Sequence, residues 1–202
     1  RRAANACYPP APLLYPGSGE RMHGIIFSEL KKFVATRHGE AAWKQVLEGA
    51  SLVNRTYLVT SQYPDEEVVR LVQSAVDLTH APPARLLEEF GEFLVPDLLQ
   101  LYGSLVRPEW KTLELLEHTE AVIHAAVRMR QPGAEPPRLI VERRDPKEVR
   151  ILYSSSRKLC SVAKGIVQGV AKHYGQTVVV REPECMHKGA RRCDISVRLV
   201  SS

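Results

Sequence analysis

Hydrophobic residues recur with a helical period from Met22 to about Arg130. Apolar side chains return every three or four residues, which is the spacing of one face of an α-helix. Glycine, proline and capping residues divide this part of the chain into separate helices. We expect a first helix ending near Gly39, a second over Glu40–Gly49, a third capped by Asp65, a fourth opened by Pro82-Pro83 and broken or kinked at Pro96, and a last one over Trp110–Met129.

After residues 131–137 (QPGAEPP) the period changes to that of β-strands, in which apolar and polar positions alternate. The predicted strands are 138–143, 149–157, 177–180 and 194–199, with a turn at Asp145-Pro146 and a single helix over 160–174. We therefore predict an α+β fold. A helical N-terminal half (about 22–130) precedes a four-stranded antiparallel sheet with one covering helix (about 136–200).

The first 21 residues differ from the rest of the chain. They carry four of the 14 prolines and show no helical or strand period. They also lack the apolar core of a signal peptide. We interpret residues 1–21, with Cys7, as a leader, an upstream linker or a vector-derived segment, and Met22 as the natural start.

Composition and charge exclude several classes of protein. The net charge of +5 is mild, and basic residues are interleaved with acidic ones, so we expect no nucleic-acid partner. Charges interrupt every apolar stretch before the roughly 20 residues that a membrane span needs, so we expect no membrane partner. Four cysteines are too few for a disulfide scaffold. We expect a cytoplasmic protein.

One predicted strand carries an unusual motif, Tyr153-x-Ser155-x-Arg157 within ILYSSSRKLC. Alternate residues of a strand share a face, so a phenol, a hydroxyl and a guanidinium would point the same way. Such a set suits an acidic ligand. On the residues alone, a solvated strand face is the alternative.

The surrounding pattern resembles the haem nitric oxide/oxygen binding (H-NOX) family, whose sensor domain also occurs in soluble guanylate cyclase. The resemblance rests on MHGIIFSELKKFV, GEAAWKQVL, the helix that carries His124, PPRL and YSSSR, and it covers Met22 to about Val200. It implies one H-NOX domain over 22–202 with a b-type haem. Arg157 would pair with a haem propionate, Tyr153 and Ser155 would add hydrogen bonds, and His124 would be the proximal iron ligand.

The resemblance also concerns Pro137 and the distal pocket. Pro137 falls at the family proline that presses on the porphyrin. Family members that bind oxygen carry a distal tyrosine, and the matching position here is Val162. The other residues expected in the pocket are also apolar: Ile26, Leu30 and Ile166. This pattern favours nitric oxide, and also carbon monoxide, over oxygen.

The expected function is therefore a non-enzymatic nitric oxide sensor. It would signal by release of His124 and rotation of the two subdomains, toward a downstream signalling protein or a fused output domain. The alternative is a haem-free module on the same scaffold that binds a lipophilic ligand or another protein. No nucleophile–base pair, carboxylate pair or phosphate-binding glycine loop indicates an enzyme.

A second candidate site lies in the last quarter of the chain. Cys160 follows the motif, and CMHKGARRC contains Cys185, His187 and Cys193. Three cysteines and a histidine form a ligand set typical of structural zinc, and some bacterial H-NOX proteins are similar. Three buried free thiols, or a Cys185–Cys193 disulfide acting as a redox switch, are the alternatives.

Overall fold

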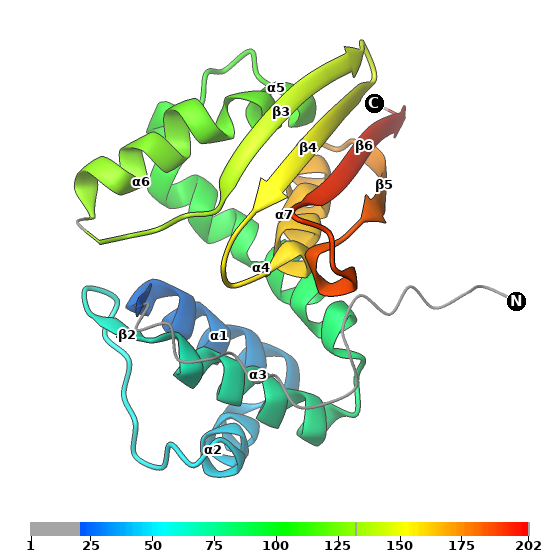
Figure 1. Cartoon of the computed structure of the whole chain (residues 1–202). Helices are drawn as coiled ribbons and strands as arrows, with labels where there is room; N and C mark the ends of the chain where they lie inside the picture. The colour runs from blue at the N-terminus through cyan, green and yellow to red at the C-terminus, as the bar shows by residue number, and fades with distance from the viewer. Residues whose placement is uncertain (1–20, 132, 202) are drawn as a thin grey trace, which may run out of the picture. The chain divides into compact units, whose positions relative to one another are not determined.

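The computed structural model describes residues 21–131 and 133–201, which include all the predicted elements (Figure 1). The expected leader lies outside the described residues except for Arg21. The described chain forms two compact units that meet within one helix, between Leu86 and Leu87. The boundary was expected at 131–137, so the helices after Leu87 belong with the sheet and not with the N-terminal helices.

The N-terminal unit is built mainly from helices. It contains β1 (Arg21–His23), α1 (Gly24–His38), α2 (Glu40–Gly49), β2 (Gln62–Pro64), α3 (Asp65–Thr79) and the first turn of α4 (Pro83–Tyr102). The apolar stripes predicted from the sequence are buried here, with Phe27, Val46 and Leu71 fully enclosed. Two details differ from the prediction. A short β1–β2 pair precedes α1 and α3, and Pro64 rather than Asp65 is the N-cap of α3.

The C-terminal unit is organised around the predicted sheet. It contains the rest of α4, η1 (Gly103–Leu105), α5 (Thr112–His118), η2 (Thr119–His124), α6 (Ala125–Arg130), β3 (Arg138–Asp145), β4 (Glu148–Ser154), α7 (Cys160–His173), β5 (Thr177–Glu184), η3 (Met186–Lys188) and β6 (Cys193–Ser201). The strands pair antiparallel in the order β3-β4-β6-β5. The α+β class predicted from the sequence is confirmed.

The strand register explains the core of this unit. Val149, Ile151 and Tyr153 alternate along β4 and stand opposite Val197, Ile195 and Cys193 of β6. Side chains two apart on a strand share a face, so this set forms one apolar face. Helices α5 and α7 cover it with Leu113, Leu116 and Val167 (Figure 1).

A close backbone crossing positions α7. A Cβ atom on Gly165 would lie 1.9 Å from the carbonyl oxygen of Glu88 on α4, and one on Gly91 would lie 2.2 Å from the carbonyl oxygen of Val162. Only glycine at both positions allows the two helices to approach this closely. Pro96 does not end α4, which continues to Tyr102.

The helix predicted over Trp110–Met129 is interrupted by a π-helical segment, η2, between α5 and α6. Thr119 Oγ1 donates a hydrogen bond to the Leu115 carbonyl at 2.7 Å, and the Ala125 amide donates to the Glu120 carbonyl five residues earlier. A threonine bonded to the preceding turn bends a helix, and short π segments frequently occur at functional sites. His124 is the last residue of this segment.

Candidate functional site

His124 is enclosed and has a carboxylate partner. Its side chain is 14% exposed, and Nδ1 lies 2.9 Å from Oε2 of Glu120, four residues earlier. An ionised carboxylate only accepts hydrogen bonds, so Nδ1 carries the proton that the ring donates. In the neutral ring this tautomer leaves Nε2 as the nitrogen with a lone pair.

The environment of His124 keeps the imidazole uncharged. Burial lowers the pKa of His124, and this effect outweighs the hydrogen bond to Glu120 and a backbone hydrogen bond with Pro137, which both raise it. The pKa of Glu120 is raised by burial, but hydrogen bonds from His124, Arg128 and the Leu139 amide bring it below its usual value. The pair at neutral pH is therefore a neutral imidazole and a carboxylate. Neutral imidazole is the form that binds a metal.

The sequence predicted that the Tyr-x-Ser-x-Arg motif lies on one strand, and this prediction is wrong. Strand β4 ends at Ser154, three residues short of the predicted end, so Ser155 and Arg157 lie in the turn that follows. Ser155 explains the ending, because its Oγ accepts a hydrogen bond from the Arg157 amide at 3.2 Å and its carbonyl accepts one from Lys158 at 3.2 Å. A serine that bonds its own backbone stabilises a turn at the expense of a strand.

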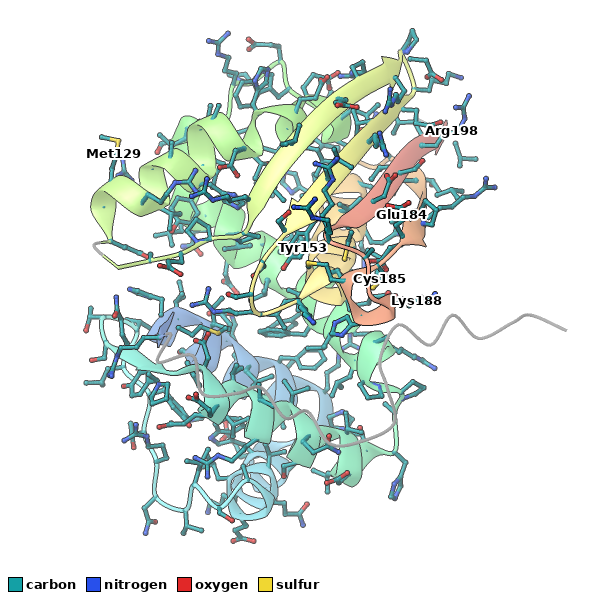
Figure 2. All side chains as sticks on the ribbon, in the orientation of Figure 1. Met129, Tyr153, Glu184, Cys185, Lys188 and Arg198 are labelled. Atoms are coloured by element: carbon teal, nitrogen blue, oxygen red, sulfur yellow. The ribbon has the colours of Figure 1, made fainter. Side chains whose placement is uncertain are left out.

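Tyr153 points into the core. Its side chain is 2% exposed, and burial raises the pKa of the Tyr153 phenol, while a hydrogen bond with Ser155 lowers it. Figure 2 shows Tyr153 on β4 beside the segment that carries Cys185, and both belong to the same buried cluster. Tyr153 thus contacts the turn that follows β4 through Ser155.

Ser155 and Arg157 line a cationic hollow of about 660 Å³. The lining residues are Arg128, Ala134, Glu135, Pro136, Arg138, Ser154, Ser155, Ser156, Arg157, Met186 and Arg191. Four of them are arginine and one is acidic, and the Arg157 Nη1 atom donates to the Glu135 carbonyl at 2.8 Å. Arginine forks pair well with carboxylates, so the hollow suits an anionic ligand.

The residues expected in the distal pocket belong to different units. Ile26, half-buried, and Leu30, buried, lie on α1 in the N-terminal unit. Val162 and Ile166, both half-buried, lie on α7 in the C-terminal unit, where Ile166 packs on the cluster around Trp110. Each is apolar, but their assembly into one pocket remains a prediction.

The three predicted cysteines come together in the C-terminal unit. The Sγ atoms of Cys160 and Cys185 lie 3.8 Å apart, those of Cys193 and Cys185 lie 3.9 Å apart, and all three cysteines are buried and outside any disulfide. A fourth ligand atom, from Glu182 on β5, lies within 4.8 Å of each of them. A hydrogen bond to Cys193 and burial together raise the pKa of the Cys160 thiol.

His187 is not part of this group. Its Nε2 lies 2.7 Å from the Lys158 carbonyl, to which it must donate because a carbonyl only accepts. Burial lowers the pKa of His187. The Glu182 carboxylate also accepts from Lys164 Nζ at 3.1 Å.

Sequence reasoning missed two carboxylates at these sites. Glu120 precedes His124 by four residues, a spacing that brings two side chains together on a helix and could have been noticed. Glu182 stands on β5 three residues before Cys185, and this spacing could have marked it as a further candidate ligand.

Comparison with known proteins defines the class to which this fold and these residues belong. A family model described as "Haem-NO-binding" (HNOB) matches residues 23–182. The match covers most of the chain, so the chain belongs to the haem-NO-binding, or H-NOX, family of haem-based gas sensors. H-NOX domains are sensor modules that are not catalytic on their own.

Solved structures agree with this assignment. The chain is 28% identical to an H-NOX protein from S. oneidensis in the Fe(II)NO ligation state, with a TM-score of 0.82, covering 88% of this chain and 99% of that one. It is 21% identical to an unliganded Fe(II) H-NOX protein from K. algicida, with a TM-score of 0.80, covering 90% and 98%. The second likeness shows the fold alone.

One curated relative is much longer than this chain, and the match covers only part of it. Soluble guanylate cyclase gcy-31 of Caenorhabditis elegans is 20% identical over 163 residues, which are 80% of this chain and 23% of that protein. The chain thus spans about a quarter of this relative. No helix among the described residues is both long and apolar enough to cross a membrane.

The residues present fit a haem. The neutral imidazole of His124 is a suitable axial ligand for iron, with its other nitrogen held by a carboxylate. The arginine-lined hollow beside Ser155 and Arg157 suits propionate groups, which are stable in a partly buried place only when paired.

Proposed function

We propose that this chain is a nitric oxide sensor that holds a b-type haem through Nε2 of His124. The observation that carries the proposal is the neutral, enclosed imidazole whose Nδ1 donates to Glu120. When bound, the haem would supply a ferrous iron able to bind a diatomic gas.

Each motif residue has a separate task in this proposal. Arg157 pairs with a propionate, and Ser155 fixes the turn that presents Arg157 and adds a hydroxyl. Tyr153 holds Ser155 from within the core, so its contribution is to position the turn. Pro137, whose backbone forms a hydrogen bond with His124, would press on the porphyrin, as the family resemblance implies.

The gas preference follows from the apolar side chains at the expected distal positions. Bound oxygen draws electron density from iron and needs a hydrogen-bond donor, whereas nitric oxide and carbon monoxide need far less. Ile26, Leu30, Val162 and Ile166 carry no donor. The similar S. oneidensis protein is described in Fe(II)NO and Fe(II)CO ligation states, which supports the proposal.

The preference for nitric oxide can be tested with one added hydroxyl. The ferrous protein is expected to bind nitric oxide and to form no stable oxygen complex in air, as followed by absorption spectroscopy. Val162→Tyr is expected to lengthen the life of the oxygen complex at least tenfold, because a hydrogen bond of about 1.5 kcal/mol corresponds to that factor. Val162→Phe is the matched control, similar in size but without a donor. A long-lived oxygen adduct in the unmodified protein would contradict the proposal.

Signalling is proposed to begin at His124. His124 would hold the haem iron, the haem would supply the gas-binding site, and nitric oxide binding would release the imidazole of His124 and let the two compact units rotate. His124 and the Ser155–Arg157 turn belong to the same unit, so the rotation would move this unit against the N-terminal one. The receiver would be a downstream signalling protein or a fused output domain in the cytoplasm, and the chain itself would not act as an enzyme.

We also propose a structural zinc ion at Cys160, Cys185 and Cys193. With zinc–sulfur bonds of about 2.3 Å, two sulfurs of a tetrahedral site lie about 3.8 Å apart. The observed separations of 3.8 and 3.9 Å match this edge. Glu182 is the better candidate for the fourth ligand than His187, because its carboxylate lies within 4.8 Å of the three sulfurs and His187 does not belong to that group.

The zinc proposal predicts one zinc per chain by elemental analysis of freshly reduced protein. Cys193→Ser is expected to remove it, because losing one of three thiolates weakens the site by orders of magnitude. Glu182→Gln is expected to weaken zinc retention against a chelator, while His187→Gln leaves it unchanged. The reverse result would assign the fourth position to His187. Metal-free protein would favour three free thiols.

A further inference from the structure

Three glutamates connect the helical segment that contains His124 with strand β3. Glu114, Glu117 and Glu120 follow one another at every third residue along α5 and η2. The Arg143 Nη2 atom donates to Glu114 Oε1 at 2.8 Å, and the Arg143 Nε atom donates to Glu117 Oε1 at 2.9 Å. The third glutamate, Glu120, accepts from the backbone amide of Leu139 at 3.1 Å.

Glu120 differs from the other two because it also contacts the candidate iron ligand. Its Oε2 atom accepts from both His124 Nδ1 and the Leu139 amide, at 2.9 and 3.1 Å, and its Oε1 accepts from Arg128 Nη2 at 2.5 Å. A single oxygen atom therefore joins the imidazole to the strand. Hydrogen bonds to a charged acceptor are about twice as strong as neutral ones.

The position of Leu139 explains why a carboxylate is accepted there. Strand β3 is an edge strand of the sheet, so its outward amides lack a strand partner. Leu139 is the second residue of β3 and follows Pro137 and Arg138 directly. Glu120 thus holds the first residues of β3, directly after Pro137.

We infer that Glu120 is the positioning residue of His124 and transmits the displacement of its imidazole to β3. The inference rests on the proposed role of His124 as iron ligand. A carboxylate that accepts the second N–H of a metal-bound histidine fixes the ring orientation and makes the ring more basic. Movement of the ring would also move Oε2 of Glu120, and with it the hydrogen bond to the Leu139 amide.

The test compares Glu120→Gln with Glu117→Gln in haem-loaded protein. Glu117→Gln removes a charge from the same helix and weakens a bond to β3, but it does not touch His124. Glu120→Gln is expected to retain haem, to lower the iron–histidine stretching frequency in resonance Raman spectra and to raise the haem midpoint potential. Glu117→Gln is expected to leave both at their wild-type values.

A second readout does not depend on haem. In the haem-free protein, exchange of the Leu139 amide hydrogen is expected to be roughly tenfold faster in Glu120→Ala, because a hydrogen bond to a charged acceptor is lost. Addition of nitric oxide to the loaded wild type is expected to change Leu139 exchange, and Glu120→Ala to abolish that change.

The possible failures are distinguishable. Wild-type Raman frequency and potential in Glu120→Gln would overturn the positioning role. Equal Leu139 exchange with and without nitric oxide in the wild type would overturn the transmission to β3. If His124→Ala keeps the ferrous spectrum, the ligand assignment itself is wrong and the inference falls with it.

Discussion

Replacing His124 with alanine is expected to abolish the five-coordinate ferrous haem spectrum completely, and added imidazole is expected to restore part of it. The reason is geometric as well as chemical. The imidazole of His124 is neutral, its Nδ1 is bonded to a carboxylate and its side chain is 14% exposed. A small free imidazole can occupy the space that alanine leaves and replace the missing nitrogen. Absorption and resonance Raman spectra of the ferrous protein measure both effects.

A matched control lies on the same helix. His118 is exposed and stacks on Trp110 with ring centroids 4.4 Å apart, so His118→Ala removes an imidazole without reaching the candidate site. It is expected to retain the wild-type spectrum. An unchanged spectrum in His124→Ala would assign the iron to another histidine. The absence of a Soret band in the unmodified protein would instead favour a haem-free, lipophilic-ligand module.

Replacing Arg157 with alanine is expected to accelerate haem loss by roughly ten- to a hundredfold. A hydrogen bond to a charged group contributes about 1.5–3 kcal/mol, and about 1.4 kcal/mol corresponds to a factor of ten. Arg157 is half-buried, so solvent screens part of the attraction and the lower end of this range is the more realistic. Transfer of haem to an excess of an apo-acceptor protein measures the rate.

Two variants separate the guanidinium of Arg157 from charge in general. Arg157→Lys keeps the charge but loses the planar fork, and an intermediate rate is expected. Arg198→Ala removes an exposed cation from β6, where it pairs with Asp145 and Glu148, and is expected to leave the rate unchanged. Haem loss from Arg157→Ala at the wild-type rate would place the motif outside the propionate contacts.

Local periodicity predicted most of the fold because each element forms its pattern within a short stretch of chain. The helix over Glu40–Gly49 and the start of α4 at the Pro82-Pro83 pair agree with the structure, because glycine and proline mark those ends directly. The strand pattern after residue 137 predicted the four strands of the sheet. The end of β4 was placed three residues late, because alternation continued through Ser155 while its hydroxyl bonded the backbone.

The sequence likewise predicted only part of each candidate site. Residue type and short spacing brought forward three of the cysteines, whereas the resemblance to the H-NOX family assigned His124 and the Tyr-Ser-Arg motif to a haem. The structure then moved Tyr153 into the core and grouped Glu182 with the cysteines instead of His187. These facts depend on which strands pair and which loops meet, and no stretch of sequence contains that information.

The sequence by itself therefore determined the α+β class, the order of the elements and the residue types that suit a haem, because these depend on local hydrophobic period and side-chain chemistry. Only the tertiary structure decided that the π-helical segment brings His124 to Glu120, and that Glu120 reaches the edge amide of Leu139. It also decided that the compact units meet within α4. The physical reason is that the contact between Glu120 and Leu139 joins residues 19 positions apart, and the division into two units depends on packing across the fold, which no local pattern specifies. Glu120 and His124 are only four positions apart, so there the structure added the π-helical form of the segment.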